Sequence, residues 1–147
     1  MFLGEHTPKL DDKGRFFLPA KFREELSEGL VITRAQERCL AIYPKETFIA
    51  KTREIAQAPG TVKQVRDYQR MLASGASDEI PDKQGRITIP PQLRRYAGLD
   101  KDIVVTGAID RVEVWDQTAW EAYVGEQEAD FADLDEVLPR VGETQQQ

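Results

Sequence analysis

The chain has 147 residues, of which 40% are hydrophobic and 31% are charged. This length suffices for one domain with a buried core, and the composition excludes collagen, a disulfide scaffold and wholesale disorder. The net charge of −6 is unusual for a nucleic-acid-binding protein, but residues 121–147 hold eight acidic side chains against Arg140, a net charge of −7. Residues 1–120 therefore carry about +1, and the charge pattern allows an anionic partner without demanding one.

Cysteine usage and hydropathy indicate the compartment. Cys39 is the single cysteine, so an internal disulfide cannot form, as is usual in a reducing cytoplasm. No apolar run approaches the roughly 20 residues that a membrane helix needs. The first residues also lack the charged and apolar regions of a secretory signal. We expect a cytoplasmic protein with no membrane partner.

The first part of the chain predicts two strands joined by a tight turn. Residues 5–10 and 15–18 are expected to pair as antiparallel strands across the turn at 11–14. Asp11 at the first turn position can accept hydrogen bonds from backbone N–H groups two residues on. Gly14 at the fourth position can supply the positive φ that ends such a loop.

A short helix and a second strand pair should follow. Pro19 suits the first turn of a helix, in which Phe22 and Leu26 lie four residues apart on one face. Two further strands are expected at 30–33 and 40–43. Together these elements form one strand–turn–strand–helix–strand–strand unit.

Two helices are predicted after this unit. The first spans residues 44–58, with Phe48 and Ile55 facing inward. The second runs to about residue 74, and Thr61 to Gln64 has the pattern of a capping box at its start.

The opening motif then occurs a second time. Asp82 to Pro90 repeats Asp11 to Pro19 at an offset of 71 residues: Asp, two polar residues, Gly, Arg, three strand formers, Pro. Strands expected at 77–80, 86–89, 103–106 and 112–115 complete the second unit. One unit alone cannot cover its apolar face, whereas two units related by a pseudo-twofold axis can bury both faces. The predicted fold is α+β with a mainly β core, a small barrel in which the two hairpins exchange partners, with helices outside it.

The expected domain organisation follows the repeat. The first repeat spans 5–47, the connecting helices 48–75 and the second repeat 76–119, and both repeats should form one compact domain. Residues 120–147 should hold a C-terminal helix and an acidic, mobile tail that begins at about Glu126.

The residues do not assemble into a catalytic site. His6 is the single histidine, which excludes a site built from several histidines. Nothing in the spacing brings His6 to Cys39 as a nucleophile pair, and no Gly-rich phosphate loop is present. We expect no enzymatic activity, no cofactor, no metal and no small-molecule substrate.

The two repeated arginines, Arg15 and Arg86, are the candidate binding residues. An exposed salt bridge to the turn Asp would contribute only about 0–1 kcal/mol, which is a weak reason to repeat an arginine. An arginine at a hairpin tip can instead contact a phosphate or a guanine edge with two hydrogen bonds. The sequence is compatible with both interpretations. The other candidates are four lysines near the two hairpins, Lys9, Lys13, Lys21 and Lys83, and four turn residues, Asp11, Gly14, Asp82 and Gly85.

These motifs resemble a known family. Residues 10–15 with 19–23, and residues 82–90 with 93–97, are similar to the two repeats of the MraZ family of bacterial transcriptional regulators, which are AbrB-like. The resemblance covers about residues 1–124 and implies a swapped-hairpin barrel that binds double-stranded DNA. The family's Asp-x-x-x-Arg motif falls on Asp11 with Arg15 and on Asp82 with Arg86.

The resemblance also implies a biological role. Family members assemble into rings, octameric in known members, and bind short direct repeats upstream of their own division and cell-wall operon, which they usually repress. A cytoplasmic, nucleoid-associated homo-oligomer would follow.

An alternative function comes from the same superfamily. AbrB-like barrels also serve as antitoxins, in which an acidic tail wraps a basic toxin. The acidic C-terminal segment fits this loosely, and the tandem repeat argues against it.

Overall fold

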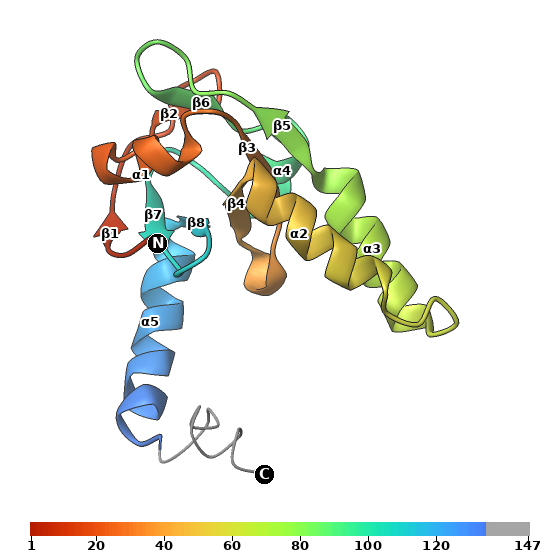
Figure 1. Ribbon diagram of the computed structural model, residues 1–147. Helices are drawn as coiled ribbons and strands as arrows, with labels where there is room; N and C mark the ends of the chain where they lie inside the picture. The colour runs from red at the N-terminus through yellow and green to blue at the C-terminus, as the bar shows by residue number, and fades with distance from the viewer. Residues whose placement is uncertain (135–147) are drawn as a thin grey trace. The chain divides into compact units, whose positions relative to one another are not determined.

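The computed structural model describes residues 1–134, and Figure 1 shows its helices and strands. The chain divides into one compact unit at residues 1–117 and a second that begins at Thr118. The elements in chain order are β1 (Glu5–His6), β2 (Arg15–Phe17), α1 (Ala20–Leu26), β3 (Leu30–Arg34), the 3-10 helix η1 (Gln36–Arg38), β4 (Leu40–Pro44), α2 (Lys45–Ala56), α3 (Lys63–Gly75), β5 (Ser77–Glu79), β6 (Arg86–Thr88), α4 (Pro91–Tyr96), β7 (Ile103–Gly107), β8 (Val112–Asp116) and α5 (Gln117–Ala132).

The strands form two antiparallel sheets, a six-stranded one in the order β1-β7-β8-β4-β3-β5 and the two-stranded β2–β6 ribbon. The predicted exchange of partners between the hairpins is confirmed, because β1 pairs with β7, β5 with β3, and β2 with β6. The predicted local pairing of residues 5–10 with 15–18 is wrong. Pro8 has no N–H to donate, so it interrupts the first strand after His6, and both segments instead take partners from the other repeat.

The pairing of the two repeats is symmetric. Phe16 lies opposite Ile87 at the centre of the ribbon. The N–H of Leu18 donates to the carbonyl of Gly85 at 2.9 Å, and the N–H of Ile89 donates to that of Gly14 at 2.8 Å. Each of these bonds is the counterpart of the other at the 71-residue offset. The backbone therefore shows the pseudo-twofold relation that the repeat predicts.

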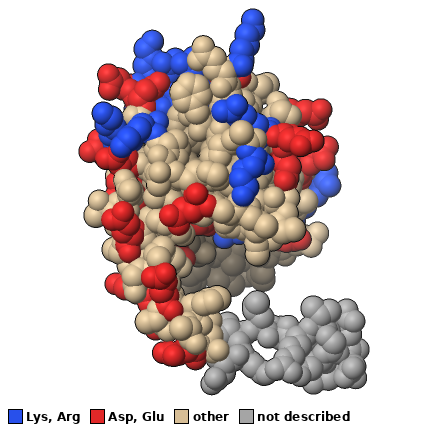
Figure 2. Space-filling model, turned by 90° about the vertical axis from the view of Figure 1, so that its left-hand side faces the viewer, with Lys and Arg blue, Asp and Glu red and all other residues tan. Residues whose placement is uncertain are grey.

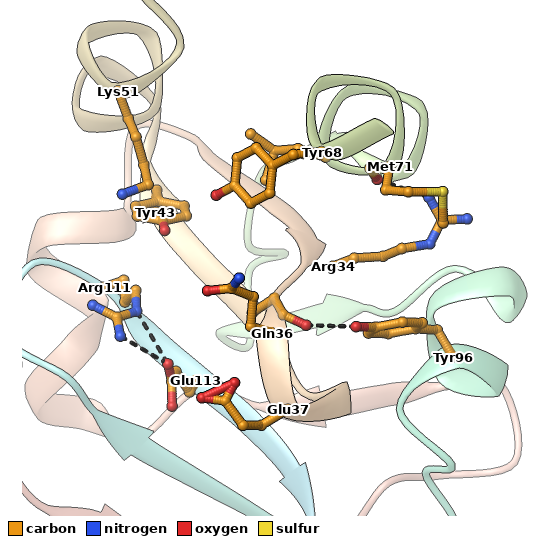
Figure 3. A pocket seen from close by; sticks show the side chains of 12 residues that line it. Arg34, Gln36, Glu37, Tyr43, Lys51, Tyr68, Met71, Tyr96, Arg111 and Glu113 are labelled. Carbon is orange, nitrogen blue, oxygen red and sulfur yellow. Dashed lines mark hydrogen bonds and ion pairs between the residues drawn. The ribbon is translucent and has the colours of Figure 1, made fainter. Parts of the chain in front are cut away.

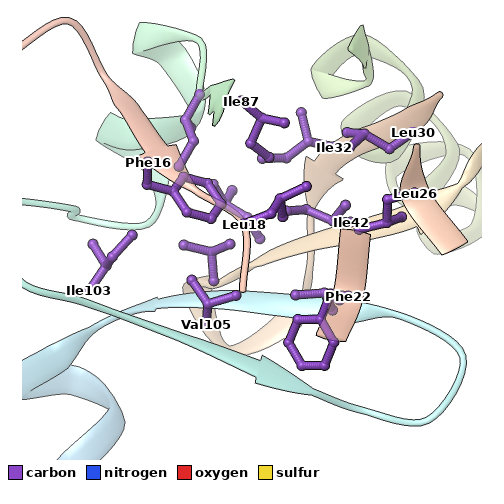
Figure 4. Packing of buried hydrophobic residues seen from close by; sticks show 14 of the residues in the cluster. Phe16, Leu18, Phe22, Leu26, Leu30, Ile32, Ile42, Ile87, Ile103 and Val105 are labelled. Atoms are coloured by element: carbon purple, nitrogen blue, oxygen red, sulfur yellow. The ribbon is translucent and has the colours of Figure 1, made fainter. Parts of the chain in front are cut away.

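The core lies between the ribbon, the large sheet and helix α1. Figure 4 shows side chains of both repeats packed together there, with Phe16 and Leu18 facing Ile103 and Val105. The predicted inner face of α1 is confirmed, because Phe22 is 1% exposed and Leu26 is fully buried. Each such side chain contributes about 1.5–3 kcal/mol on burial.

Helices α2 and α3 connect the repeats and lie side by side (Figure 1). The Oγ1 of Thr33 donates to the carbonyl of Leu72 at 2.7 Å, a buried bond that holds α3 to β3. The predicted capping box is wrong, because α3 begins after Val62 and has no side-chain cap. The Val62 N–H instead donates to the Pro59 carbonyl, so Thr61 lies inside a turn. Phe48 and Ile55 of α2 are half-buried.

Helix α5 is longer than the sequence predicts. It continues through Glu126 to Ala132, because this stretch has no proline and is rich in Ala, Glu and Gln, which favour helix. None of its residues is fully buried, and the rings of Trp120 and Tyr123 stack at 6.1 Å. The mobile tail predicted further on falls mostly at 135–147, outside the described residues. No helix within residues 1–134 is long and apolar enough to span a membrane.

We expect the unit at residues 1–117 to keep its stability when the end of the chain is removed. Truncation after Glu126 removes no buried residue of the described chain, so the free energy of unfolding should change by less than about 1 kcal/mol. Thermal and urea unfolding of the full and truncated chains measure this. A larger loss would show that the distal half of α5 packs as part of the core.

Candidate nucleic-acid interface

Both hairpin turns are organised by the carboxylate of their first residue. Asp11 Oδ1 accepts hydrogen bonds from the backbone N–H of Lys13 at 3.0 Å and of Arg15 at 2.8 Å. Asp82 Oδ1 does the same for Gln84 and Arg86, both at 2.9 Å. The turn prediction for both Asp residues is therefore confirmed. The positive φ of Gly14 (79°) and Gly85 (81°) is confirmed as well.

The second oxygen of each carboxylate holds the arginine that follows. Asp11 Oδ2 accepts from Arg15 Nε at 2.8 Å, and Asp82 Oδ2 accepts from Arg86 Nε at 2.8 Å. Within residues 1–134 the terminal Nη atoms of Arg15 and Arg86 donate no hydrogen bond to a protein acceptor. The two side chains are 30% and 25% exposed. The arginine is thus both paired with its Asp and able to present its two-nitrogen fork to a partner.

These contacts stabilise the ionised carboxylates. The backbone N–H of Arg15 is the main cause that lowers the pKa of Asp11 below its usual range, with its side chain adding to the effect. The backbone N–H of Arg86 lowers the pKa of Asp82 in the same way. Both carboxylates are therefore charged at neutral pH, and the two arginines stay oriented.

The structure adds two arginines that sequence reasoning missed. Arg94 of α4 lies under the first turn, where a Cβ on Gly14 would come within 2.7 Å of its guanidinium carbon. Arg23 of α1 lies under the second turn against Gly85, with its Nε donating to the carbonyl of Leu18 at 2.9 Å. Arg23 and Arg94 are 71 residues apart, so the repeat offset could have identified them.

The candidate lysines have different surroundings. Lys13 and Lys83 are exposed in the two turns, whereas the Lys9 ammonium forms an ion pair with Asp102. Lys21 is exposed on α1, with its Nζ near Gly4. Figure 2 shows basic side chains gathered at the top of the molecule, the end that carries β2 and β6 in Figure 1, with acidic side chains beside them.

The hollow in Figure 3 is lined by other kinds of side chain than the basic ones at the β2–β6 end. It has a volume of about 400 Å³, and its lining includes Tyr43, Tyr68 and Tyr96. Its Arg111 is paired with Asp110 and Glu113. Burial raises the pKa of Tyr43 to about 12. Its hydroxyl therefore stays protonated near neutral pH and cannot act as a general base.

The remaining reactive candidates are not brought together. Cys39 is buried, its pKa is raised mainly by that burial, and its Sγ contacts the carbonyl of Gln36. The ring of His6 packs edge-on against Phe22. Among residues 1–134 no cluster of three or more His, Cys, Asp or Glu is placed to hold a metal ion.

Comparison with known proteins gives the family. The family model described as "MraZ protein, putative antitoxin-like" matches residues 1–71 and again 72–139. The chain belongs to the MraZ family. It is 72% identical over 134 residues to the transcriptional regulator MraZ of Cutibacterium acnes, covering 91% of this chain and 94% of that protein. It is 61% identical to the protein of the same name from Kineococcus radiotolerans, covering 96% and 99% of the two chains. The α+β fold implied by the resemblance is therefore confirmed.

The turn glycines offer a test of the close contact between the repeats. Gly14→Ala should be destabilising, because alanine costs about 1–2 kcal/mol at positive φ and its Cβ must also displace Arg94. Gly98→Ala is the matched control for backbone strain, since Gly98 has a φ of 61° but open space around it. Gly60→Ala has neither effect. Urea unfolding should rank the loss as Gly14 above Gly98 above Gly60, and equal losses at Gly14 and Gly98 would argue against the Arg94 contact.

The lowered pKa values predict acid sensitivity of the turns. A folded-state pKa below the unfolded value of about 3.9 gives a stabilisation that is present above that pH and is lost as pH falls through the folded pKa. The double variant Asp11→Asn/Asp82→Asn cannot titrate there. The wild type should be the more stable protein at pH 7, and this advantage should shrink by pH 2.5. Urea titrations of both proteins at pH 7, 4 and 2.5 measure it, and a constant difference would contradict the assignment.

Proposed function

We propose that this protein is a DNA-binding transcriptional regulator in which Arg15 and Arg86 contact the DNA. One observation carries the proposal: both arginines are held through Nε by a turn carboxylate, and their Nη atoms donate no hydrogen bond to the protein within residues 1–134. That geometry suits two-pronged contact with a guanine edge or a phosphate. The names of the C. acnes and K. radiotolerans relatives, both called transcriptional regulators, support the same function.

The β2–β6 ribbon is the element that enters the DNA in this proposal. The major groove is about 12 Å wide and admits a two-stranded β-ribbon. Arg15 and Arg86 provide base contacts, and Lys13, Lys83, Lys21 and Lys9 provide phosphate contacts that set affinity and salt dependence. The turn residues Asp11, Gly14, Asp82 and Gly85 position the arginines.

We further propose that several subunits act together. Residues 1–120 carry a net charge of only about +1, so one subunit alone should bind DNA weakly. A ring-shaped homo-oligomer, an octamer as in known family members, would place several ribbons on spaced direct repeats and gain affinity through effective concentration. The target would be the promoter of the protein's own division and cell-wall operon, which it would repress in the cytoplasm at the nucleoid. Both repeats then work as one compact binding domain, with no cofactor and no catalysis.

Substitution of the arginines tests the proposal. Arg15→Ala and Arg86→Ala should each weaken binding to the promoter by about 1–3 kcal/mol per contact while leaving the fold intact. Arg15→Ala should have the larger effect, because more lysines lie in the first hairpin. Arg15→Lys should recover phosphate binding but not two-pronged base contact. Fluorescence anisotropy on promoter and scrambled duplexes at two salt concentrations measures this.

The matched control is Arg53→Ala, which removes an exposed arginine from α2, away from both turns. It should bind promoter DNA as the wild type does. A melt and a light-scattering mass accompany each variant. If Arg15→Ala bound like the wild type, the proposed contact would be wrong. If it unfolded or lost its oligomer, the arginine would be structural.

A second candidate function is an antitoxin-like protein interaction. The description of the matching family model includes the words antitoxin-like, and α5 has four acidic and no basic residues. In this case α5 would bind a basic protein partner. If a basic protein co-purifies with the full chain but not with a chain truncated after residue 116, the antitoxin-like function would be favoured over DNA binding.

A further inference from the structure

The outer face of the β2–β6 ribbon has one departure from twofold symmetry. Its inner residues, Phe16 and Ile87, are buried, so the outer face consists of the two cross-strand pairs Arg15–Thr88 and Arg86–Phe17. The pseudo-twofold axis exchanges these pairs and maps one arginine onto the other. Only the neighbours differ: Arg86 lies beside an aromatic ring, and Arg15 beside a threonine.

Phe17 is exposed on this face. Its relative exposure is 51%, whereas its neighbour Phe16 is 1% exposed. The guanidinium carbon of Arg86 lies 5.9 Å from the centroid of the Phe17 ring. Because the ring buries so little surface, it contributes little to the core. The counterpart, Thr88, is also exposed.

We propose that Phe17 contacts a thymine C5-methyl group in the major groove beside the base read by Arg86, and so determines the direction in which the ribbon lies on its site. This inference rests on the proposed DNA-binding function. Apolar side chains, Phe among them, are the groups that read the thymine methyl. Arg86 next to the ring supplies the charge complementarity that brings this face to DNA.

The reason lies in the symmetry of the ribbon and of the DNA site. A twofold-symmetric reader matches a palindromic site, as half-site palindromes match protein dimers. A symmetric ribbon would lie equally well in either direction on a non-palindromic direct repeat. The Phe17–Thr88 difference removes this degeneracy, because the ring reaches further into the groove than the threonine methyl. It provides the asymmetry that a direct repeat requires.

The probe is the DNA duplex upstream of the protein's own gene, with each thymine in turn replaced by deoxyuridine, which lacks only the methyl group. Wild-type affinity should fall about fourfold at one thymine of a repeat, the value expected for one buried methyl. Phe17→Ala should bind the unmodified duplex more weakly and show no difference between thymine and deoxyuridine at that position. A general structural effect would not remove sensitivity to a single methyl group.

A side-chain exchange tests the direction. The double variant Phe17→Thr/Thr88→Phe keeps the composition of the ribbon and transfers the ring to the other arginine. The methyl-sensitive thymine should move to the opposite side of the same repeat. The single variant Thr88→Phe is the control, and it should show sensitivity on both sides.

The outcomes separate this inference from the proposed function. An unchanged deoxyuridine profile in Phe17→Ala, with binding still lost in Arg86→Ala, would overturn the role of Phe17 alone. Unfolding of Phe17→Ala or a reduced light-scattering mass would assign Phe17 to packing or subunit contact, and would overturn it too. Failure of the wild type to bind the duplex would overturn the DNA-binding function itself, and with it this inference.

Discussion

The arrangement of the molecule depends on the hydrogen bonds that the two repeats exchange at the β2–β6 ribbon. The bonds from Leu18 to Gly85 and from Ile89 to Gly14 join each hairpin to the turn of the other. One such bond contributes only about 1 kcal/mol net. Their larger effect is geometric, because they bring two turns that are 71 residues apart onto one short ribbon. The same exchange places Phe16 and Ile87 side by side on the inner face of the ribbon, over the common core.

The turn carboxylates connect this backbone arrangement to the surface. Each Asp uses one oxygen to close its turn and the other to hold an arginine through Nε. An exposed ion pair of this type contributes little to stability, so its main consequence is orientation. An arginine can be held through Nε and still offer two further nitrogens, whereas a lysine has a single ammonium. This explains why arginine suits this position and lysine does not.

The charges around the β2–β6 ribbon limit how strongly one subunit could attract DNA. Basic side chains at the ribbon end lie beside acidic ones, and Lys9 is already paired with Asp102. Under the proposed function, binding would therefore rely on a few well-placed donors repeated across subunits rather than on a strong overall field. Arg23 and Arg94 under the turns add positive charge close to the same ribbon. The aromatic hollow of Figure 3 lies among α2, α3 and the β3–β4 hairpin. Of its charged groups, Arg111 is paired with Glu113, and Arg34 donates to the carbonyl of Met71.

Local features of this protein could be predicted from its sequence, because they depend on residues close together in the chain. The spacing of Asp11 and Gly14 predicted the turn, and the spacing of Phe22 and Leu26 predicted the buried face of α1. The repeat also predicted that partners would be exchanged. The register of that exchange, the partner of β1 and the positions of Arg23 and Arg94 under the opposite turns were decided only in the tertiary structure. These depend on contacts between segments about 60 or more residues apart, where burial of a shared core, rather than local backbone preference, selects the partner.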